Sequence, residues 1–290
     1  MDIKLPEASK IKVIATDLDG TLLNSKGRVS ERNKTVIRKI LEKYPDIHFV
    51  IASGRGRPAT MRVRQDIGIM DRPNTESILC NGCIIYDSCG NILYQELLPN
   101  DLILKIHKIV PSLSESCFEY TSGDDAIFFK EKWSKFAHEM YDEQTITEDM
   151  DEFSKKIEAN ETKINKVCFM VSKPSEINEI VEALDNLKKE YNMELSYTTP
   201  IFIEYMPSNI NKGSGLIHLM NILNVKKEEI IAFGDGGNDF EFLQNAGWPV
   251  AMANANEKLK SYACLITKSN EEDGVADLLE KIFLKEELMN

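Results

Sequence analysis

Short apolar runs alternate with segments of helical periodicity near the beginning of this chain. Residues 11–16 (IKVIAT) and 47–54 (IHFVIASG) are continuous apolar runs that end in turn residues, as expected for strands covered on both faces. Between them, residues 30–44 space their apolar side chains at helical intervals behind Ser30, a residue suited to the N-cap of a helix. This pattern predicts a βαβ unit with a right-handed crossover, and therefore a parallel sheet.

The same alternation returns in the last third of the chain. We expect helices at residues 212–224, 239–246 and 272–286, and buried strands at residues 229–235 and 248–253. The two ends of the chain are therefore predicted to form halves of one α/β sheet.

The middle of the chain has a different pattern. It contains hairpin-like segments such as residues 117–131 (CFEYTSGDDAIFFKE), with helices between them. We therefore predict an α/β protein with a Rossmann-like parallel sheet core, formed by residues 1–85 and 200–290. An α+β domain of residues 86–199 is inserted into that core.

Composition and charge exclude several classes of protein. With 290 residues and 42% hydrophobic content, the chain can bury a sizeable core. A formal net charge of −12 argues against general binding to nucleic acid, which requires clustered lysine and arginine. No run approaches the roughly 18 apolar residues of a membrane span, and the first residues do not resemble a secretory signal. We expect a soluble, cytoplasmic protein that binds neither nucleic acid nor membranes.

Cysteine and histidine give little sign of a metal site. The sequence has six cysteines, and Cys80, Cys83 and Cys89 lie close together in it. Zinc binding is one interpretation, but a single CxxC with no second pair favours buried, reduced thiols. The four histidines fall on strand or helix patterns and are expected to be packing or surface residues: His48, His107, His138 and His218.

Polar residues gather where the predicted core strands end and core helices begin. In a parallel sheet, ligands bind outside the carboxyl ends of the strands, so these positions are candidates for a site. The candidates are Asp17 and Asp19 after the first strand, Ser53, Gly54 and Arg55 after the second, Lys212 at a helix start, and Asp235, Asn238 and Asp239 after a late strand.

These residue types suit phosphate chemistry. Carboxylates from distant segments that meet at one sheet edge require a cation, and ligands that are all oxygen favour Mg²⁺. A hydroxyl, a lysine and backbone amides opened by glycine can hold a phosphate group. The combination of metal, phosphate cradle and a spare carboxylate predicts phosphoryl transfer.

Four short motifs carry a family resemblance. The segments DLDGTLL (17–23), IASGR (51–55), NKGSGL (211–216) and GDGGND (234–239) together resemble the haloacid dehalogenase superfamily. The later PVAMANANEKLK and EDGVADLLE are similar to closing motifs of its Cof-type phosphatases, in which a C2-type cap is inserted between the second and third motifs. The chain departs from the family pattern in two small ways: Ser53 stands where threonine is common, and Ala253 stands where many relatives have glycine.

The resemblance implies roles for the two N-terminal aspartates. Asp17 would be the nucleophile that forms an aspartyl-phosphate. Asp19 would act as general acid for the leaving alkoxide and then as general base for water. Asp17, the backbone carbonyl of Asp19 and the side chain of Asp235 would hold Mg²⁺. The ion would keep Asp17 ionised, while Asp19 could carry a proton near neutral pH.

It also implies roles for the remaining candidates. Ser53 and Lys212 would bind phosphate oxygens, with Gly54 beside them, and Gly20 and Thr21 would supply backbone amides. Asn238 would contact the phosphate or the shell of the metal, and Asp239 would orient Lys212 or a metal-bound water. Arg55 is either a phosphate contact or a surface ion-pair residue.

The predicted function is therefore a Mg²⁺-dependent phosphatase for small phosphorylated metabolites, with sugar phosphates as the favoured class. The inserted cap would close over the substrate, and residues 119–133 are candidates for contacts with the leaving group. Two alternatives remain: a phosphomutase of the same fold, and a non-catalytic sensor of phosphometabolites. The presence of Asp17, Asp19, Lys212 and Asp235 argues against the sensor, which needs no nucleophile.

Overall fold

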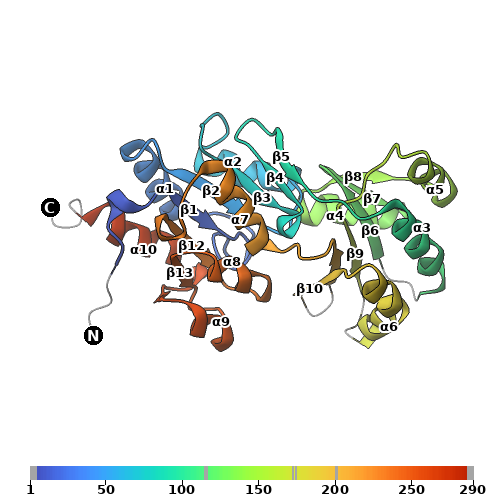
Figure 1. Cartoon of the computed structure of the whole chain (residues 1–290). Coiled ribbons are helices and arrows are strands. Elements are labelled where there is room, and N and C mark those ends of the chain that lie inside the picture. The colour runs from blue at the N-terminus through green and yellow to red at the C-terminus, as the bar shows by residue number, and fades with distance from the viewer. Residues whose placement is uncertain (1–4, 114–116, 172, 174, 200–201, 286–290) are drawn as a thin grey trace. The chain divides into compact units, whose positions relative to one another are not determined.

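The chain forms two compact units in the computed structural model, which describes residues 5–113, 117–171, 173, 175–199 and 202–285. Unit 1 consists of Met1–Ser53, Met61–Leu93 and Asn211–Asn290, and unit 2 consists of Gly54–Thr60 and Tyr94–Ile210 (Figure 1). The inserted domain predicted for residues 86–199 overlaps the longer segment of unit 2, and its role as a cap stays a prediction.

Unit 1 is built on a sheet of eight strands. From one edge to the other, they are β14 (Leu265–Ile266), β13 (Trp248–Ala251), β12 (Ile230–Gly234), β1 (Val13–Thr16), β2 (His48–Ala52), β3 (Ser77–Leu79), β4 (Ile84–Tyr86) and β5 (Ile92–Gln95). Neighbouring strands from β14 to β3 pair in parallel, and β3 pairs with β4 in antiparallel orientation. The predicted parallel core, formed from both ends of the chain, is confirmed.

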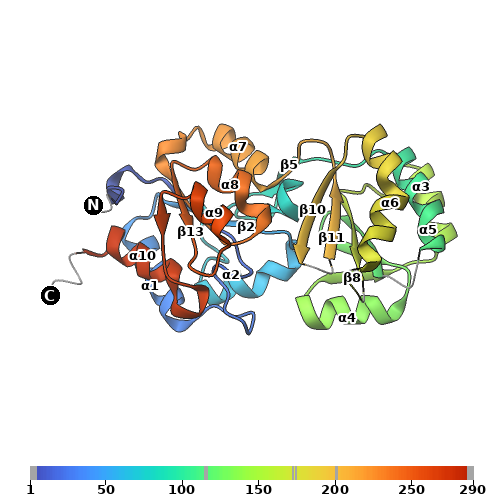
Figure 2. The same ribbon diagram turned by 90° about the horizontal axis from the view of Figure 1, so that it is seen from below.

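Helices form a layer on each side of this sheet. One layer contains α1 (Glu31–Lys43), α2 (Met61–Ile67) and α10 (Gly274–Phe283), and the other contains α7 (Lys212–Leu223), α8 (Phe240–Gln244) and α9 (Glu257–Tyr262). Figure 2 shows α1 and α10 together on one side of the sheet and α7 and α8 on the other. The sheet is therefore covered on both faces, which explains why its strands are continuous apolar runs.

Local sequence signals set the starts of two helices that flank the site. The Ser30 hydroxyl accepts a hydrogen bond from the Asn33 amide at 3.1 Å and caps α1, as predicted. At the start of α7, the Asn211 side chain accepts a hydrogen bond from the Ser214 backbone amide at 2.9 Å. In return, the Asn211 backbone amide donates to the Ser214 hydroxyl at 3.0 Å. This reciprocal capping box places Lys212 at the first position of α7.

Unit 2 has a six-stranded sheet with helices packed on one face. The strand order is β10 (Glu194–Thr199), β11 (Phe202–Met206), β9 (Lys166–Met170), β6 (Cys117–Ser122), β7 (Asp125–Phe128) and β8 (Gln144–Thr147). In the described part of this sheet, β7 pairs with β8 in parallel, and the other neighbouring strands pair in antiparallel orientation. The helices α3 (Asn100–Ile109), α5 (Met150–Glu158) and α6 (Ser175–Glu190) share a core with alternate residues of the strands, including Tyr120, Phe169 and Tyr205.

The opposite face of the unit 2 sheet carries polar side chains as well as apolar ones. The helix α4 (Glu131–Tyr141) packs near β7 and β8, where Cys117, Ala126, Phe128 and Ala137 form a small cluster. Glu119, Cys168 and Glu204 are register partners across β6, β9 and β11, so they lie in one row on this face.

Several predictions about individual side chains can be compared with the structure. Cys80 and Cys83 are buried and form no disulfide, as expected for reduced thiols. His48 lies on β2 beside Glu76, and His107 is buried on α3. Among the helices in the described part of the chain, none has the length and apolar character needed to cross a membrane.

Candidate active site

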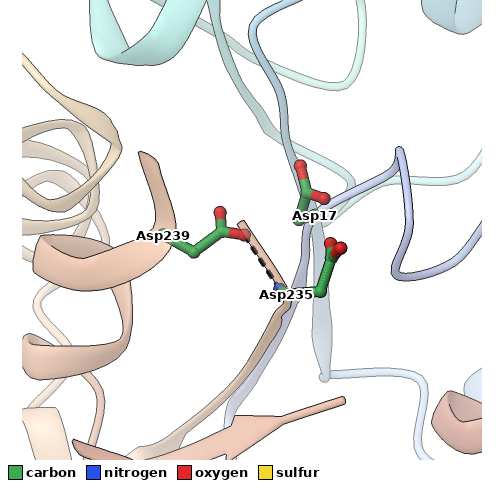
Figure 3. Close-up of side chains that lie close together, drawn as sticks. All are labelled: Asp17, Asp235 and Asp239. Carbon is green, nitrogen blue, oxygen red and sulfur yellow. Dashed lines mark hydrogen bonds between the residues drawn. The ribbon is translucent and has the colours of Figure 1, made fainter. Parts of the chain in front are cut away.

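Three carboxylates from two neighbouring strands and a short helix lie together at the carboxyl edge of the unit 1 sheet. Asp17 follows β1 and Asp235 follows β12, and the two strands pair in parallel with Thr16 opposite Phe233. Asp239 comes from the 3-10 helix Gly237–Asp239. One oxygen from each carboxylate can be chosen so that all three lie within 4.8 Å of one another (Figure 3).

Lys212 is the cation of this cluster. Its side chain is 1% exposed, and its Nζ donates to Asp17 Oδ1 at 2.6 Å and to Asp239 Oδ1 at 2.7 Å. Burial alone would lower the pKa of Lys212, but Asp17 and Asp239 outweigh it and raise the pKa above the ordinary value. Lys212 therefore stays charged and joins α7 to the ends of β1 and β12.

Asp239 is held by donors on both of its oxygens. Oδ1 accepts from Lys212, and Oδ2 accepts from the backbone amides of Asp235 at 3.0 Å and Gly236 at 2.9 Å. Figure 3 shows the bond to the Asp235 amide as a dashed line. Because its side chain is buried and fully engaged in this way, Asp239 is placed to fix Lys212 and the loop after β12.

The turn after Asp17 packs directly on Asp235. Gly20 has φ of +81°, and a Cβ built on it would lie 2.3 Å from Asp235 Oδ2, so only glycine fits both the backbone and the contact. The next residue, Thr21, donates its hydroxyl to Asp235 Oδ1 at 2.8 Å. The glycine and threonine of the first motif thus position a carboxylate of the last one.

The cluster has more negative charge than Lys212 can balance. Burial raises the pKa of Asp17 well above its ordinary range, against the opposing effect of Lys212. Burial also raises the pKa of Asp235 to about 6, against the hydrogen bond from Thr21. Three carboxylates face one ammonium, and the metal ligands that this cluster of described residues offers are oxygen atoms; this ligand set fits a divalent cation such as Mg²⁺.

Ser53 and Asn238 are connected through Asn81, a residue that the sequence motifs did not single out. Ser53 follows β2 and is 1% exposed; its amide donates to Ile78 and its carbonyl accepts from the Asn81 amide at 3.0 Å. The Asn238 side chain donates to Asn81 Oδ1 at 3.0 Å. Asn81 is buried with φ of +55°. It therefore links the second and fourth motifs.

The roles of three other predicted residues stay predictions, although the charge of Asp19 contributes to the raised pKa of Asp235. Asp19 is exposed in the turn after β1, and its proposed roles stay predictions. Gly54 and Arg55 begin the short segment that belongs to unit 2, where Lys166 Nζ donates to the Gly54 carbonyl at 2.7 Å. Their contact with phosphate also stays a prediction.

Two asparagines escaped the sequence reasoning. Asn81 lies between Cys80 and Cys83, where the CxxC spacing indicates a question about metal binding by the cysteines and gives no sign of a role for the asparagine. Asn254 belongs to the segment PVAMANANEKLK, and its side chain donates to the Gly20 carbonyl at 2.8 Å and to Asp235 Oδ2 at 3.2 Å. The only available signal was position, since each follows a core strand within a few residues.

Comparison with known proteins shows the family to which this chain is similar. Residues 14–279 match the family model of haloacid dehalogenase-like hydrolases. An uncharacterized hydrolase of Schizosaccharomyces pombe is 29% identical over 96% of this chain and 93% of its own length. A 5-amino-6-(5-phospho-D-ribitylamino)uracil phosphatase of Bacillus subtilis is 28% identical, over 92% of this chain and 93% of its own.

Solved structures give the same result. A haloacid dehalogenase-like hydrolase from Bacteroides thetaiotaomicron superposes with a TM-score of 0.82 at 25% identity, and the match covers 94% of this chain and 100% of that one. A crystal structure from Thermotoga maritima has a TM-score of 0.78 at 28% identity, covering 94% of this chain and 97% of that one.

Proposed function

Because this chain belongs to the haloacid dehalogenase-like hydrolase family, we propose that it is a magnesium-dependent phosphatase of small phosphorylated metabolites, with sugar phosphates as the favoured class. The observation that carries the proposal is the contact of buried Lys212 with Asp17 and Asp239, beside Asp235 at the same sheet edge. The phosphatase named among the relatives supports hydrolysis of phosphate esters.

The donor set determines how a metal would be held. The carboxylates of Asp17 and Asp235 would bind Mg²⁺ together with the backbone carbonyl of Asp19. When bound, the ion supplies charge neutralisation for the phosphate and for the attacking carboxylate. The ion would also balance the excess negative charge of the cluster. Without it, burial and repulsion from neighbouring carboxylates raise the pKa of Asp17 and Asp235.

Catalysis then follows from the two aspartates of the first motif. An Asp17 oxygen attacks phosphorus, the phosphorus–oxygen bond to the leaving group breaks, and an aspartyl-phosphate forms. Asp19 gives its proton to the departing alkoxide and then takes one from the water that attacks the aspartyl-phosphate. Inorganic phosphate leaves, and both carboxylates return to their starting states. Lys212 orients Asp17 through its 2.6 Å contact and balances negative charge during transfer.

The other residues would bind the phosphate or hold those that do. We assign phosphate contacts to the Ser53 hydroxyl and to Lys212, with Gly54, Arg55 and Asn238 as additional contacts. Gly20 and Thr21 would present backbone amides. Asp239 would position Lys212, a role that its three hydrogen bonds support.

Substrate choice is assigned to the inserted segment. We propose that residues 86–199 act as a cap and that residues 119–133 contact the leaving group. Sugar phosphates are favoured as the class that the family resemblance implies, and the Bacillus subtilis relative is named for a substrate with a phosphorylated sugar-alcohol chain. The site would then work on a soluble metabolite in the cytoplasm.

The test is phosphate release from a panel of sugar, triose, nucleotide and cofactor monophosphates, each measured with Mg²⁺ and with a chelator. We expect turnover with Mg²⁺, loss of turnover with the chelator, and a fall of about 10⁴-fold or more in kcat for Asp17→Asn. A phosphomutase would return the phosphate to substrate and release little of it. Binding of sugar phosphates without turnover under either condition would support the sensor and reject the phosphatase.

A further inference from the structure

One exposed asparagine bridges two elements of the site. Asn254 follows β13, and its amide nitrogen donates to the Gly20 carbonyl at 2.8 Å and to Asp235 Oδ2 at 3.2 Å. Its side-chain oxygen accepts a hydrogen bond from the backbone amide of Asn270 at 3.1 Å. One side-chain amide group therefore joins the turn after β1, the carboxylate after β12 and the segment after β14.

The Asp235 carboxylate is held from two directions. Thr21 donates to Oδ1 at 2.8 Å and Asn254 donates to Oδ2, so each oxygen has one side-chain donor. A carboxylate with a donor on only one oxygen can rotate about its last torsion, because such torsions are broad. Two donors from different loops restrict this rotation and leave the remaining lone pairs in a fixed direction.

A second asparagine strengthens the same turn without touching Asp235. The Asn270 side chain donates to the Leu23 carbonyl at 2.8 Å, and the neighbouring Glu271 side chain accepts from the Ser25 amide. The turn after β1 is thus tied at Gly20 by Asn254 and farther along by Asn270. These two ties allow the effect on Asp235 to be separated from a general effect on the turn.

We propose that Asn254 is a positioning residue that fixes the Asp235 carboxylate for a divalent cation and so sets the affinity of the site for that cation. The inference rests on the metal site of the proposed function. Hydrogen-bond partners of a metal ligand typically contribute about 10- to 100-fold in metal affinity. Since Asn254 is exposed, removing its side chain creates no buried cavity.

The test measures Mg²⁺ binding directly by calorimetric titration, independently of turnover. We expect Asn254→Ala to raise the Kd for Mg²⁺ about tenfold, and Asn254→Leu, which keeps the volume but cannot donate, to do the same. Thermal unfolding in chelator should remain near that of the wild type for both variants. At saturating Mg²⁺, the KM for a phosphate ester should change little, because neither variant removes a phosphate contact.

Two matched asparagine variants serve as controls. Asn270→Ala removes the hydrogen bond to the Leu23 carbonyl but leaves both side-chain donors to Asp235 in place. Asn245→Ala removes a side-chain amide that donates to the Glu241 carbonyl at 2.8 Å and makes no contact with Asp235 in the described structure. Both should bind Mg²⁺ within about twofold of the wild type. A wild-type Kd in Asn254→Ala, or an equal loss in Asn270→Ala, overturns the proposal.

The experiment distinguishes failure of the positioning role of Asn254 from failure of the proposed phosphatase function. If Asp235→Asn abolishes Mg²⁺ binding and Asn254→Ala weakens it, the positioning role stands even where no phosphate is released. If the wild type binds no Mg²⁺, or Asp235→Asn binds it normally, the positioning role and the metal site both fail. Phosphate release that survives chelation would instead contradict only the magnesium-dependent phosphatase.

Discussion

Each unit buries a lysine, and the two lysines have different surroundings. In unit 1, Lys212 contacts the carboxylates of Asp17 and Asp239, with Asp235 close by. In unit 2, Lys166 has a side chain that is 5% exposed and contacts the carboxylate of Glu204 and the Gly54 carbonyl. A buried charge needs a partner in both cases, but the number of carboxylates differs.

The two units also differ in how excess negative charge is balanced. Burial raises the pKa of Glu119 to about 7, with Glu143 adding to the effect and Lys166 opposing it. Burial raises the pKa of Glu143 as well. In unit 2 a proton can therefore neutralise the surplus, whereas the carboxylates of unit 1 converge closely enough to hold a cation. The comparison separates a polar cluster that supports structure from one that can bind a ligand.

The comparison is tested most strongly by replacing each lysine with methionine. Lys212→Met should lower kcat about 10³-fold, because it removes a buried charge that contacts the nucleophile. Lys166→Met should lower kcat less than about tenfold, because the ion-pair partner of Lys166 is Glu204 of unit 2 and not a carboxylate of the unit 1 cluster. Phosphate release at saturating Mg²⁺ measures both. Equal losses in the two variants would show that the buried lysine of unit 2 is as close to the chemistry as Lys212.

A second prediction concerns the stability of unit 2. Lys166→Met leaves the buried Glu204 without its lysine partner and should cost about 3 to 5 kcal/mol in the free energy of unfolding. The double variant Lys166→Met with Glu204→Met should recover most of that loss, because an apolar pair needs no charge compensation. Trp133 lies in unit 2 and Trp248 in unit 1, so fluorescence in a Trp248→Phe background reports on unit 2 during urea unfolding.

If the double variant is no more stable than Lys166→Met alone, the pair is not the source of the loss. Lys105→Met is the matched control, because Lys105 forms an exposed ion pair with Glu190 on the same unit. Exposed pairs contribute about 0 to 1 kcal/mol, so this control should change stability little.

A third prediction uses the cation site of unit 1. A ligand that binds only the folded state at 100 times its Kd stabilises that state by about 2.7 kcal/mol. We expect Mg²⁺ to have this effect on unit 1, followed through Trp248 in a Trp133→Phe background. Asp235→Asn should remove the effect, because it removes one of the metal ligands. Stabilisation of the same size in Asp235→Asn would place the ion elsewhere.

The sequence was sufficient for the parts of the site that follow from strand order. Asp17 and Asp235 lie together because parallel neighbours end at the same edge, and that rule needs only the strand pattern. Lys212 could be placed at a helix start from its capping residues. These predictions depend on local signals and on a topology with few alternatives.

Asn81, Asn254 and Lys166 could not be predicted in this way. The two asparagines act through hydrogen bonds whose partners depend on the paths of separate loops, and asparagine in a loop is common for local reasons. Lys166 meets Glu204 only when β9 and β11 pair in one register. A shift of one residue would turn the side chain to the other face of the sheet.

The smallest expected effect is the pH dependence of unit 2. Glu119 has a pKa of about 7 in the folded chain against 4.5 as its ordinary value, because burial favours the protonated form. The groups around it are Glu143, Lys166, Cys168 and Glu204. The folded state therefore binds more protons than the unfolded state between these values. The stability that Glu119 contributes is present below about pH 4.5 and is lost as the pH rises through 7.

Glu119→Gln should remove this loss, because a neutral amide needs no proton to be buried. We expect the variant to gain about 1 to 2 kcal/mol over the wild type at pH 8 relative to pH 5, measured by urea unfolding in the Trp248→Phe background. Glu158→Gln, at the exposed end of α5, is the control and should show the wild-type profile. Parallel stability profiles for Glu119→Gln and the wild type would mean that protonation of Glu119 does not balance the charge of unit 2, and the contrast with the cation site of unit 1 would then fail.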